Sequence, residues 1–215
     1  MAGPDATSRR PVLIVLAGVN GAGKSSLAGH LLTQAGLTWF NPDALARRLM
    51  DEGYSPVEAN GLAWTEGKRL LDEALTAGRD HAFETTLGGA TLPATILDAA
   101  RTHDVFMLFC GLDSPERHIQ RVRSRVAHGG HDIPEGKIRE RWETSRRNLI
   151  RLMPCLWDLQ VFDNSAEAAP GDDIPNPVLV LHVTDGQVVV PDPAEGIPSC
   201  MPEWAADIVR AALEA

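Results

Sequence analysis

The stretch Gly18–Ser25 reads G-V-N-G-A-G-K-S and decides the fold class of this 215-residue chain. It matches the pattern G-x-x-x-x-G-K-[ST] at every fixed position. The apolar run before it, Pro11–Ala17, predicts a buried strand. Lys24–Ala35 predicts the helix that follows, ended by Gly36. A glycine-rich turn between a strand and a helix predicts a loop that wraps around phosphate groups.

The residue types in this loop explain its chemistry. Glycine at positions 18, 21 and 23 lets the backbone point its N–H groups inward, where a side chain would collide with phosphate. Lys24 is placed to reach the β- and γ-phosphates of a nucleotide, and the Ser25 hydroxyl is placed to ligate Mg²⁺. We therefore expect ATP and Mg²⁺ to bind here. The expected nucleotide contacts are Gly18, Asn20, Gly21, Ala22, Gly23, Lys24, Ser25 and Ser26, with Arg121 from a later helix.

The rest of the chain alternates short apolar runs with longer amphipathic segments, which is typical of an α/β domain with a mostly parallel sheet. The most hydrophobic run, Val105–Leu112, predicts a central strand buried on both faces. We expect further strands over 38–40, 81–84 and 159–162, a hairpin over 178–190, and helices over 44–50, 56–77, 92–101 and 202–213.

These elements predict a three-layer P-loop NTPase fold of nucleotide-kinase type. The kinase core is expected over residues 1–165, with a helical, arginine-rich lid over about 114–151. The loop, hairpin and helix over 166–215 are expected to form a C-terminal appendage on the same domain. GTPases carry an N-K-x-D motif, which the sequence lacks, and Gly111 interrupts the apolar approach to Asp113 that a Walker B strand would need.

The charge is acidic overall and basic in one segment. The net charge of −9 disfavours nucleic acid as the main partner. Ten of the 20 Lys and Arg residues lie within 117–151, beside only four acids. Such a local concentration of basic residues favours a small polyanionic ligand, although two solvated helix faces would give the same composition. Ser114 is expected to cap the first helix of this segment, and Asp132 with Glu135 to form a capping box on the second.

Cysteine use and hydropathy indicate a cellular compartment. Cys110, Cys155 and Cys200 are scattered and include no C-x-x-C pair, which disfavours a disulfide framework and a structural zinc site. The first apolar run is too short for a signal peptide, and no window approaches the ~20 apolar residues of a membrane span. We expect a cytoplasmic protein without membrane contact.

Two acidic residues lie where a parallel sheet presents its ligand-binding edge. Asp43 could accept the proton of a substrate hydroxyl, or it could cap the helix that follows, and the sequence supports both interpretations. Glu84 lies in the run F-E-T-T-L-G-G (83–89), where it could hold Mg²⁺ through water while Thr86 positions a substrate. A plain strand end is the alternative.

The basic segment repeats cationic side chains at helical spacing. Arginine suits phosphate because its fork bonds two oxygens and keeps its charge, so one or two of these residues should stabilise the transferring phosphate. His128 and His131 flank a glycine pair, where a hinge or phosphate contact is favoured over a metal site. The repeated cations are Arg117, Arg121 and Arg125 in the first helix, and Lys137, Arg139 and Arg141 in the second.

The order of motifs from 12 to 165 resembles the zeta-toxin family of P-loop kinases, in its compact bacterial branch. The P-loop is generic, whereas F-E-T-T-L (83–87) and G-G-H-D-I-P-E (129–135) are far more specific, and N-P-D (41–43) and D-N-S (163–165) follow the same order. The resemblance implies ATP- and Mg²⁺-dependent phosphorylation of a hydroxyl on a small substrate. The best-known members phosphorylate the 3′-hydroxyl of the sugar in UDP-N-acetylglucosamine.

The resemblance also implies roles for individual residues. Arg125 and either Arg139 or Arg141 would stand near the γ-phosphate. One departure is clear: where the larger toxins carry an arginine soon after E-x-T, this chain has Gly88 and Gly89. The remaining matches are Lys24 and Ser25 at the ATP–Mg²⁺ site, Asp43 as catalytic base, and Glu84 and Thr86 at the substrate site.

The leading hypothesis is a kinase that uses ATP and a small hydroxylated substrate, with Asp43, Lys24, Arg125 and Arg141 as catalytic residues and Ser25 and Glu84 at the metal. The alternatives are a toxin neutralised by an antitoxin protein, an antibiotic phosphotransferase, a polynucleotide 5′-hydroxyl kinase, and a nucleotide-dependent binding module without catalysis. The identity of the acceptor stays open at the level of sequence.

Overall fold

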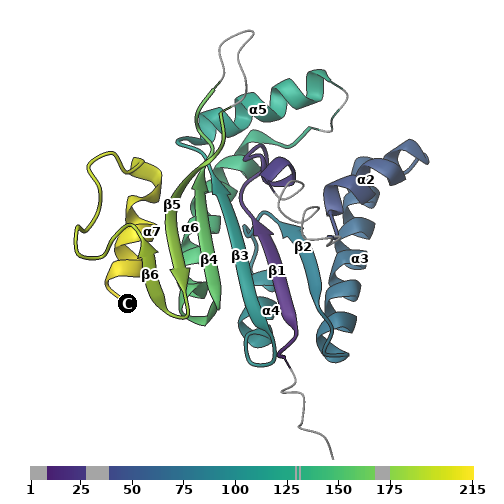
Figure 1. Cartoon of the computed structure of the whole chain (residues 1–215). Helices are drawn as coiled ribbons and strands as arrows, with labels where there is room; N and C mark the ends of the chain where they lie inside the picture. Colours follow the sequence, from purple (N-terminus) through teal and green to yellow (C-terminus); the bar gives the residue numbers. More distant parts are fainter. Residues whose placement is uncertain (1–8, 28–38, 129, 131, 168–174) are drawn as a thin grey trace, which may run out of the picture.

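Six strands form one sheet in the order β2-β1-β3-β4-β5-β6 (Figure 1). The computed structural model describes residues 9–27, 39–128, 130, 132–167 and 175–215. Strands β1 to β4 run parallel, and β5 and β6 add an antiparallel edge. The predicted α/β fold with a mostly parallel sheet is confirmed. The strands are β1 (Val12–Ala17), β2 (His81–Thr85), β3 (Asp104–Gly111), β4 (Asp158–Asp163), β5 (Val178–Thr184) and β6 (Gln187–Val190).

Helices flank the sheet and lie beyond its edge. In Figure 1, α4 and α6 lie behind the sheet, and α3 packs beside β2 with α2 against it. Of the helix predicted over 24–35, residues 24–27 are helical and the remainder falls outside the described ranges. The helices are α2 (Pro42–Asp51), α3 (Pro56–Thr76), α4 (Thr91–Ala99), α5 (Pro115–Ala127), α6 (Glu135–Leu152) and α7 (Glu203–Leu213), with a 3₁₀ turn at Met153–Cys155.

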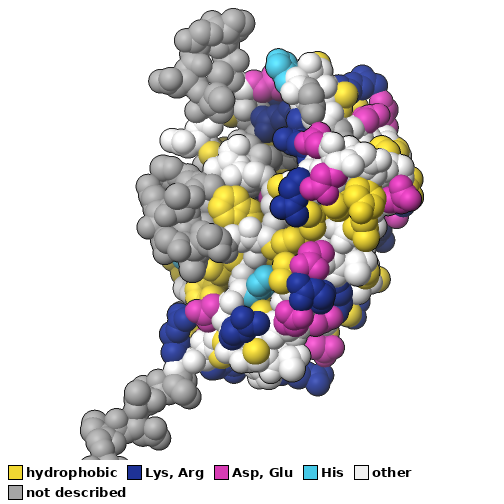
Figure 2. All heavy atoms as spheres, turned by 90° about the vertical axis from the view of Figure 1, so that its right-hand side faces the viewer, with side chains coloured by type: hydrophobic (Ala, Val, Ile, Leu, Met, Phe, Trp, Pro, Cys, Tyr) yellow, Lys and Arg dark blue, Asp and Glu magenta, His cyan; other side chains and the backbone are white. Residues whose placement is uncertain are grey.

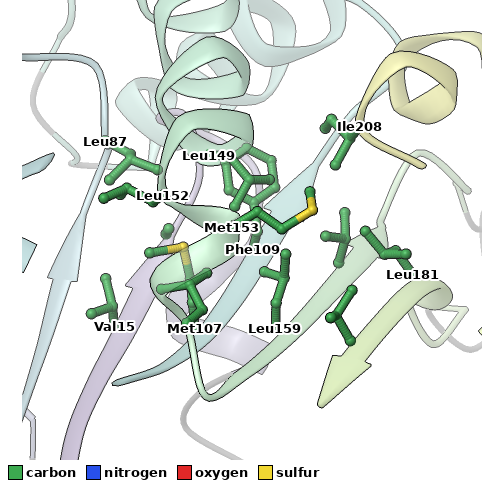
Figure 3. Packing of buried hydrophobic residues seen from close by; sticks show 14 of the residues in the cluster. Val15, Leu87, Met107, Phe109, Leu149, Leu152, Met153, Leu159, Leu181 and Ile208 are labelled. Atoms are coloured by element: carbon green, nitrogen blue, oxygen red, sulfur yellow. The ribbon is translucent and has the colours of Figure 1, made fainter. Parts of the chain in front are cut away.

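The main core lies between the sheet and α6 (Figure 3). Alternate residues of the central strands, such as Met107 and Phe109, are buried and meet Leu149 from α6. Fully burying a side chain of this size contributes about 1.5–3 kcal/mol. The second half of α6 is therefore fixed to the sheet, while its first half extends toward the carboxyl ends of the strands.

Two local predictions need correction. The strand expected over 38–40 is a single parallel bridge between Phe40 and Phe83, and residue 38 falls outside the described ranges. The capping box at the start of α6 is wrong: Pro134 is the N-cap residue, and no side chain caps the helix. Asp132 instead accepts a 2.8 Å hydrogen bond from the next backbone N–H, because its carboxylate lies before the chain turns into the helix.

Other local predictions are confirmed. Ser114 caps α5, since its Oγ accepts a hydrogen bond from the Arg117 N–H at 3.3 Å. Strands β5 and β6 form the predicted hairpin, with Asp185 and Gly186 at positive φ in the turn. Within the described ranges, none of the helices has both the length and the apolar character that crossing a bilayer requires.

The carboxyl ends of β1, β2, β3 and β4 meet at one edge of the sheet. The loops that leave these strands are linked by hydrogen bonds. Asn164, just beyond β4, donates its backbone N–H to the Gly111 carbonyl at 3.0 Å and its side-chain amide to the Ala22 carbonyl at 2.8 Å. The D-N-S motif therefore ties the end of β4 to the glycine-rich loop. The candidate site lies at this edge.

Candidate functional site

Three glycines of the 18–25 loop have positive φ, at 138° for Gly18, 83° for Gly21 and 91° for Gly23. A Cβ at Gly18 would lie 2.2 Å from the Cys110 carbonyl oxygen, and one at Gly23 would lie 2.4 Å from the Asn164 amide nitrogen. Glycine is required at these positions both for conformation and for the close approach. Gly18 and Ala22, predicted as nucleotide contacts, are absent from the lining of the cavity over the loop. The Ala22 carbonyl instead accepts hydrogen bonds from Asn164 and Cys110.

Lys24, Ser25 and Glu84 meet at the floor of the loop. The Lys24 ammonium lies 3.4 Å from Glu84 Oε1, and both side chains are more than nine-tenths buried. The Ser25 hydroxyl donates to Glu84 Oε2 at 2.9 Å. Asn41, from the start of α2, donates its amide to the same oxygen at 2.9 Å. The carboxylate of Glu84 is therefore held between the loop and α2.

Asn41, and not Asp43, caps α2. Its Oδ1 accepts a hydrogen bond from the Ala44 N–H at 3.1 Å, and Pro42 occupies the first helical turn. The interpretation of Asp43 as the cap is thus wrong, because Asn41 already satisfies that donor. Asp43 lies in the first turn, one-third exposed, with its Oδ2 3.8 Å from Arg125 Nη1.

Of the three arginines at four-residue spacing on α5, two line the cavity beside the loop. Arg121 and Arg125 reach it, and Arg121 also donates to the Asn164 carbonyl at 2.8 Å. Arg117 instead forms ion pairs with Asp113, at 2.8 Å, and with Glu167. This pairing lowers the pKa of the Asp113 carboxyl. Asp113 is therefore engaged with α5.

The sequence left a choice between Arg139 and Arg141 on α6. Arg141 donates to the Asn20 side-chain oxygen at 2.6 Å and lies in the site, where burial lowers its pKa. Arg139 pairs with Glu116 on α5, away from the loop. Arg141 passes close to Gly88, where a Cβ would lie 2.6 Å from the Arg141 Cγ. Gly88 thus provides the space that the stem of Arg141 occupies.

Two cavities open at this edge of the sheet and share the residues Asn20, Asp43 and Glu84. The smaller, of about 450 Å³, lies over the loop and is called the phosphate cavity. The larger, of about 630 Å³, lies between α3 and α6 and is called the acceptor cavity. The phosphate cavity also contains Gly21, Gly23, Lys24, Ser25, Ser26, Asn41, Ala44, Arg47, Arg121 and Arg125.

The loop after β2 forms one wall of the acceptor cavity and includes Thr86. Asn148 of α6 donates its amide to the carbonyls of Leu87, at 2.8 Å, and Gly89, at 3.1 Å. Thr144 donates to the Gly88 carbonyl at 3.0 Å. Leu87 is buried with a φ of 54°, a conformation that is unusual outside glycine. The wall is therefore shaped by long-range hydrogen bonds from α6.

His118 lies beneath the loop and was not predicted as a site residue. Its Nδ1 lies 2.9 Å from the Asn20 carbonyl oxygen, and the ring is buried. Burial lowers the pKa of His118 to about 4. The ring is therefore neutral at pH 7, and its Nδ1–H donates to Asn20. No local sequence signal marks His118, since it lies within a run of arginines.

In the parts of the chain that the structure describes, no group of three or more His, Cys, Asp and Glu side chains is arranged to hold a metal ion. His128 Nδ1 lies 2.8 Å from the Ser124 carbonyl oxygen within α5, and His131 falls outside the described ranges. The Ser25 hydroxyl, in the loop, and the Glu84 carboxylate, hydrogen-bonded to it, are oxygen donors that suit a cation such as Mg²⁺.

The strand–loop–helix start, the parallel sheet and the glycine-rich loop define a P-loop protein. A family model described as an AAA domain matches residues 13–150, more than half of the chain, and the chain therefore belongs to this AAA domain family. A search of curated proteins gives no match.

Several solved structures share the fold. The complex of AvrRxo1-ORF1 with AvrRxo1-ORF2 and ATP matches with a TM-score of 0.64 and 18% identity, over 96% of this chain and 76% of that one. The PezAT chromosomal toxin-antitoxin system of Streptococcus pneumoniae matches with a TM-score of 0.54 and 16% identity, over 73% and 68%. The Pnkp1/Rnl/Hen1 RNA repair complex matches with a TM-score of 0.51 and 19% identity, over 70% and 49%. At these identities the likeness concerns the fold alone.

Proposed function

We propose that this protein is an ATP- and Mg²⁺-dependent kinase that transfers the γ-phosphate of ATP to a hydroxyl of a small molecule. The observation that carries the proposal is the junction of two cavities at Asn20, Asp43 and Glu84. One cavity contains the P-loop lysine and three arginines, and the other shares Asp43 with it and contains neither that lysine nor those arginines. A donor and an acceptor bound in the two cavities would meet at this junction.

The phosphate cavity supplies binding and charge stabilisation for the donor. Lys24, Arg121 and Arg125 neutralise the triphosphate, and the P-loop amides hold its oxygens. Ser25 and Glu84 would hold Mg²⁺, which would neutralise part of the negative charge of the triphosphate. ATP is bound in the AvrRxo1-ORF1 complex, which shares this fold. We assign α5 and the first half of α6 to the lid that carries these arginines.

The acceptor side supplies the base. The acceptor hydroxyl oxygen attacks the γ-phosphorus, the bond from that phosphorus to the β–γ bridging oxygen breaks, and ADP leaves. The hydroxyl proton passes to Asp43, whose carboxylate lies at the wall between the cavities. Arg141, anchored on Asn20, stands on the same wall and stabilises charge on the transferring group.

The test is the substitution Asp43→Asn. We expect transfer from labelled ATP to a metabolite extract to fall at least ~10²-fold, the usual contribution of a general base. Calorimetry should show an ATP affinity within about twofold of wild type, a margin that is small on the scale of binding energies. Asp51→Asn, at the other end of α2, is the matched control. Undiminished transfer by the Asp43→Asn variant would remove Asp43 from the mechanism.

A second candidate function follows from the resemblance to the zeta-toxin family. Two of the solved structures with this fold are a toxin–antitoxin system and a complex of AvrRxo1-ORF1 with a second protein, AvrRxo1-ORF2. As a second proposal, this kinase acts as a toxin with a protein partner. The resemblance implies UDP-N-acetylglucosamine as its acceptor, which is the alternative to the phosphate-free acceptor inferred below. Growth arrest on expression, absent with Lys24→Ala, would support this function, and unaffected growth with active kinase would argue against it.

A further inference from the structure

The two cavities carry opposite charges. The phosphate cavity contains four cations, Lys24, Arg47, Arg121 and Arg125, which suits a triphosphate. The described lining of the acceptor cavity contains only Lys137 and Arg141 as cations. Its carboxylates are Asp132 and Glu140, in addition to the shared Asp43 and Glu84. The acceptor cavity therefore carries more negative than positive charge.

Both cations of the acceptor cavity are already engaged. The Lys137 ammonium lies 2.9 Å from Glu140 Oε2, so a phosphate at Lys137 would also meet that carboxylate. Arg141 is turned toward the shared wall, where it donates to Asn20 at 2.6 Å. An acceptor that carried its own diphosphate would bury two or more negative charges beside carboxylates, which is unfavourable unless each charge is paired.

The side of the cavity formed by α3 is apolar and faces solvent. Trp64 is 51% exposed and Val57 is 84% exposed, and Asn60 lies between them at helical spacing on the same side of α3. An exposed indole ring beside polar groups is suited to stack on the apolar face of a sugar-like ring. With carboxylates nearby, the same ring also attracts an amine.

The surface around this side of the molecule does not suit a polyanion. Figure 2 views the face formed by α2 and α3, where acidic and basic side chains are interleaved with hydrophobic ones. A groove that follows a nucleic acid strand needs a continuous basic track with stacking side chains. On the face drawn, the described residues form no such track.

Resting on the proposed kinase function, we infer that the acceptor is a polyol without phosphate groups, either uncharged or amine-bearing, whose apolar face stacks on Trp64. Its hydroxyls face the polar side chains of Asn60 and Thr86, and the reacting hydroxyl points to Asp43. An amine on the acceptor would be neutralised by Asp132 or Glu140.

The first test identifies the product. The protein is incubated with Mg²⁺, γ-labelled ATP and a metabolite extract, and in parallel with UDP-N-acetylglucosamine or a 5′-hydroxyl oligonucleotide. A labelled product that contains a single phosphate group supports the inference. A labelled sugar nucleotide or oligonucleotide overturns it while leaving the kinase function intact. Absence of any labelled product overturns both.

The second test uses variants of the cavity wall and the product found in the first. Trp64→Ala should raise the KM for the acceptor about 10-fold while the KM for ATP stays unchanged, because the variant loses the stacking contact with the acceptor and leaves the phosphate cavity intact. Trp157→Ala is the matched control. Trp157 is 45% exposed and precedes β4, so it lies at the amino ends of the parallel strands, away from the cavity at their carboxyl ends. An unchanged acceptor KM in Trp64→Ala would overturn the proposed stacking.

The charge of the acceptor is tested with the variant Glu140→Gln. The control is Glu143→Gln, which removes a carboxylate of α6 outside the cavity. An acceptor KM raised about tenfold by the first variant alone corresponds to the loss of one charge-assisted contact and supports an amine-bearing polyol. An unchanged KM supports an uncharged one. A lowered KM indicates an anionic acceptor and overturns the inference.

Discussion

The phosphate cavity and the acceptor cavity share a wall but differ in how they are built. The phosphate cavity is organised around one continuous stretch, Gly18–Ser25, whose position follows from β1 and whose backbone N–H groups we propose as the phosphate ligands. The acceptor cavity is assembled from α3, the loop after β2, the turn before α6, and α6 itself. Its character depends on side chains from separate parts of the chain.

Because of this difference, the binding groups of the two cavities can be exchanged to different degrees. Backbone N–H groups bind phosphate whatever the neighbouring side chains are, so the donor is set by the loop. On the proposed function, side chains such as Trp64 and Glu140 select the acceptor, so exchanging them should change the substrate without disturbing the loop. The shared residues Asn20, Asp43 and Glu84 are the places where a change in one cavity should be felt in the other.

The largest effect is expected from Lys24→Ala, which removes a side chain that lines the phosphate cavity and not the acceptor cavity. We expect kcat for transfer to fall on the order of 10³-fold, because the ammonium is a buried donor aimed at developing charge. Affinity for the acceptor, measured by calorimetry without ATP, should be unchanged. Lys68→Ala, on α3 and paired with Asp72, is the control. Loss of acceptor affinity in Lys24→Ala would mean that the cavities are not separate in binding.

A smaller effect is expected from Gly88→Ala, which acts on the shared wall from the acceptor side. The new Cβ would meet the stem of Arg141 at 2.6 Å and displace its guanidinium from Asn20. We expect kcat to fall ~10- to 100-fold. This is less than the cost of deleting a preorganised donor, because the guanidinium is displaced and not removed. Steady-state kinetics with Gly89→Ala as control provide the comparison, since the space around Gly89 is open.

The same substitution can be tested through Arg141. In an Arg141→Ala background, Gly88→Ala should cost little more, because the side chain it displaces is gone. Such non-additivity is the mark of two residues that act through one contact. Equal costs of Gly88→Ala in both backgrounds would show that Gly88 acts through the loop backbone and not through Arg141.

The same contrast explains how much of the fold and of the candidate site the sequence predicts. The P-loop, the parallel strands and the Ser114 cap could be predicted, because each depends on residues that are adjacent in sequence. Asp43, Glu84 and Thr86 were assigned to the site by their positions after strands, and they line the cavities there. These features are local, and local physics decides them.

Other features depend on partners far along the chain. Arg117 and Arg125 each lie four residues from Arg121, so the sequence does not distinguish them. In the structure Arg117 pairs with Asp113 and Glu167, whereas Arg125 lines the phosphate cavity. Asn41, His118 and Arg47 were not predicted as site residues. Asn41 contacts Glu84, His118 contacts the Asn20 carbonyl, and Arg47 lines the phosphate cavity. No short pattern encodes such contacts.

The smallest effect expected is on stability, and it concerns His118 beneath the shared wall. Its pKa is about 4 in the folded protein, against about 6.5 in an unfolded chain, so the unfolded state binds the proton first as pH falls. The contribution of the neutral ring is complete above pH ~6.5 and is lost progressively toward pH 4. By this linkage the loss is about 2 kcal/mol at pH 5.

The substitution His118→Asn tests this directly. The Asn amide can donate to the Asn20 carbonyl as the ring Nδ1–H does, but it does not titrate in this range. The free energy of unfolding, from urea titrations at pH 7.5, 6 and 5, should therefore fall less steeply in this variant than in wild type. His128→Asn, at the exposed C-cap position that follows α5, should keep the wild-type slope. Equal slopes in wild type and His118→Asn would mean that His118 is not held neutral under the loop, and the shared wall at Asn20 would then need another support.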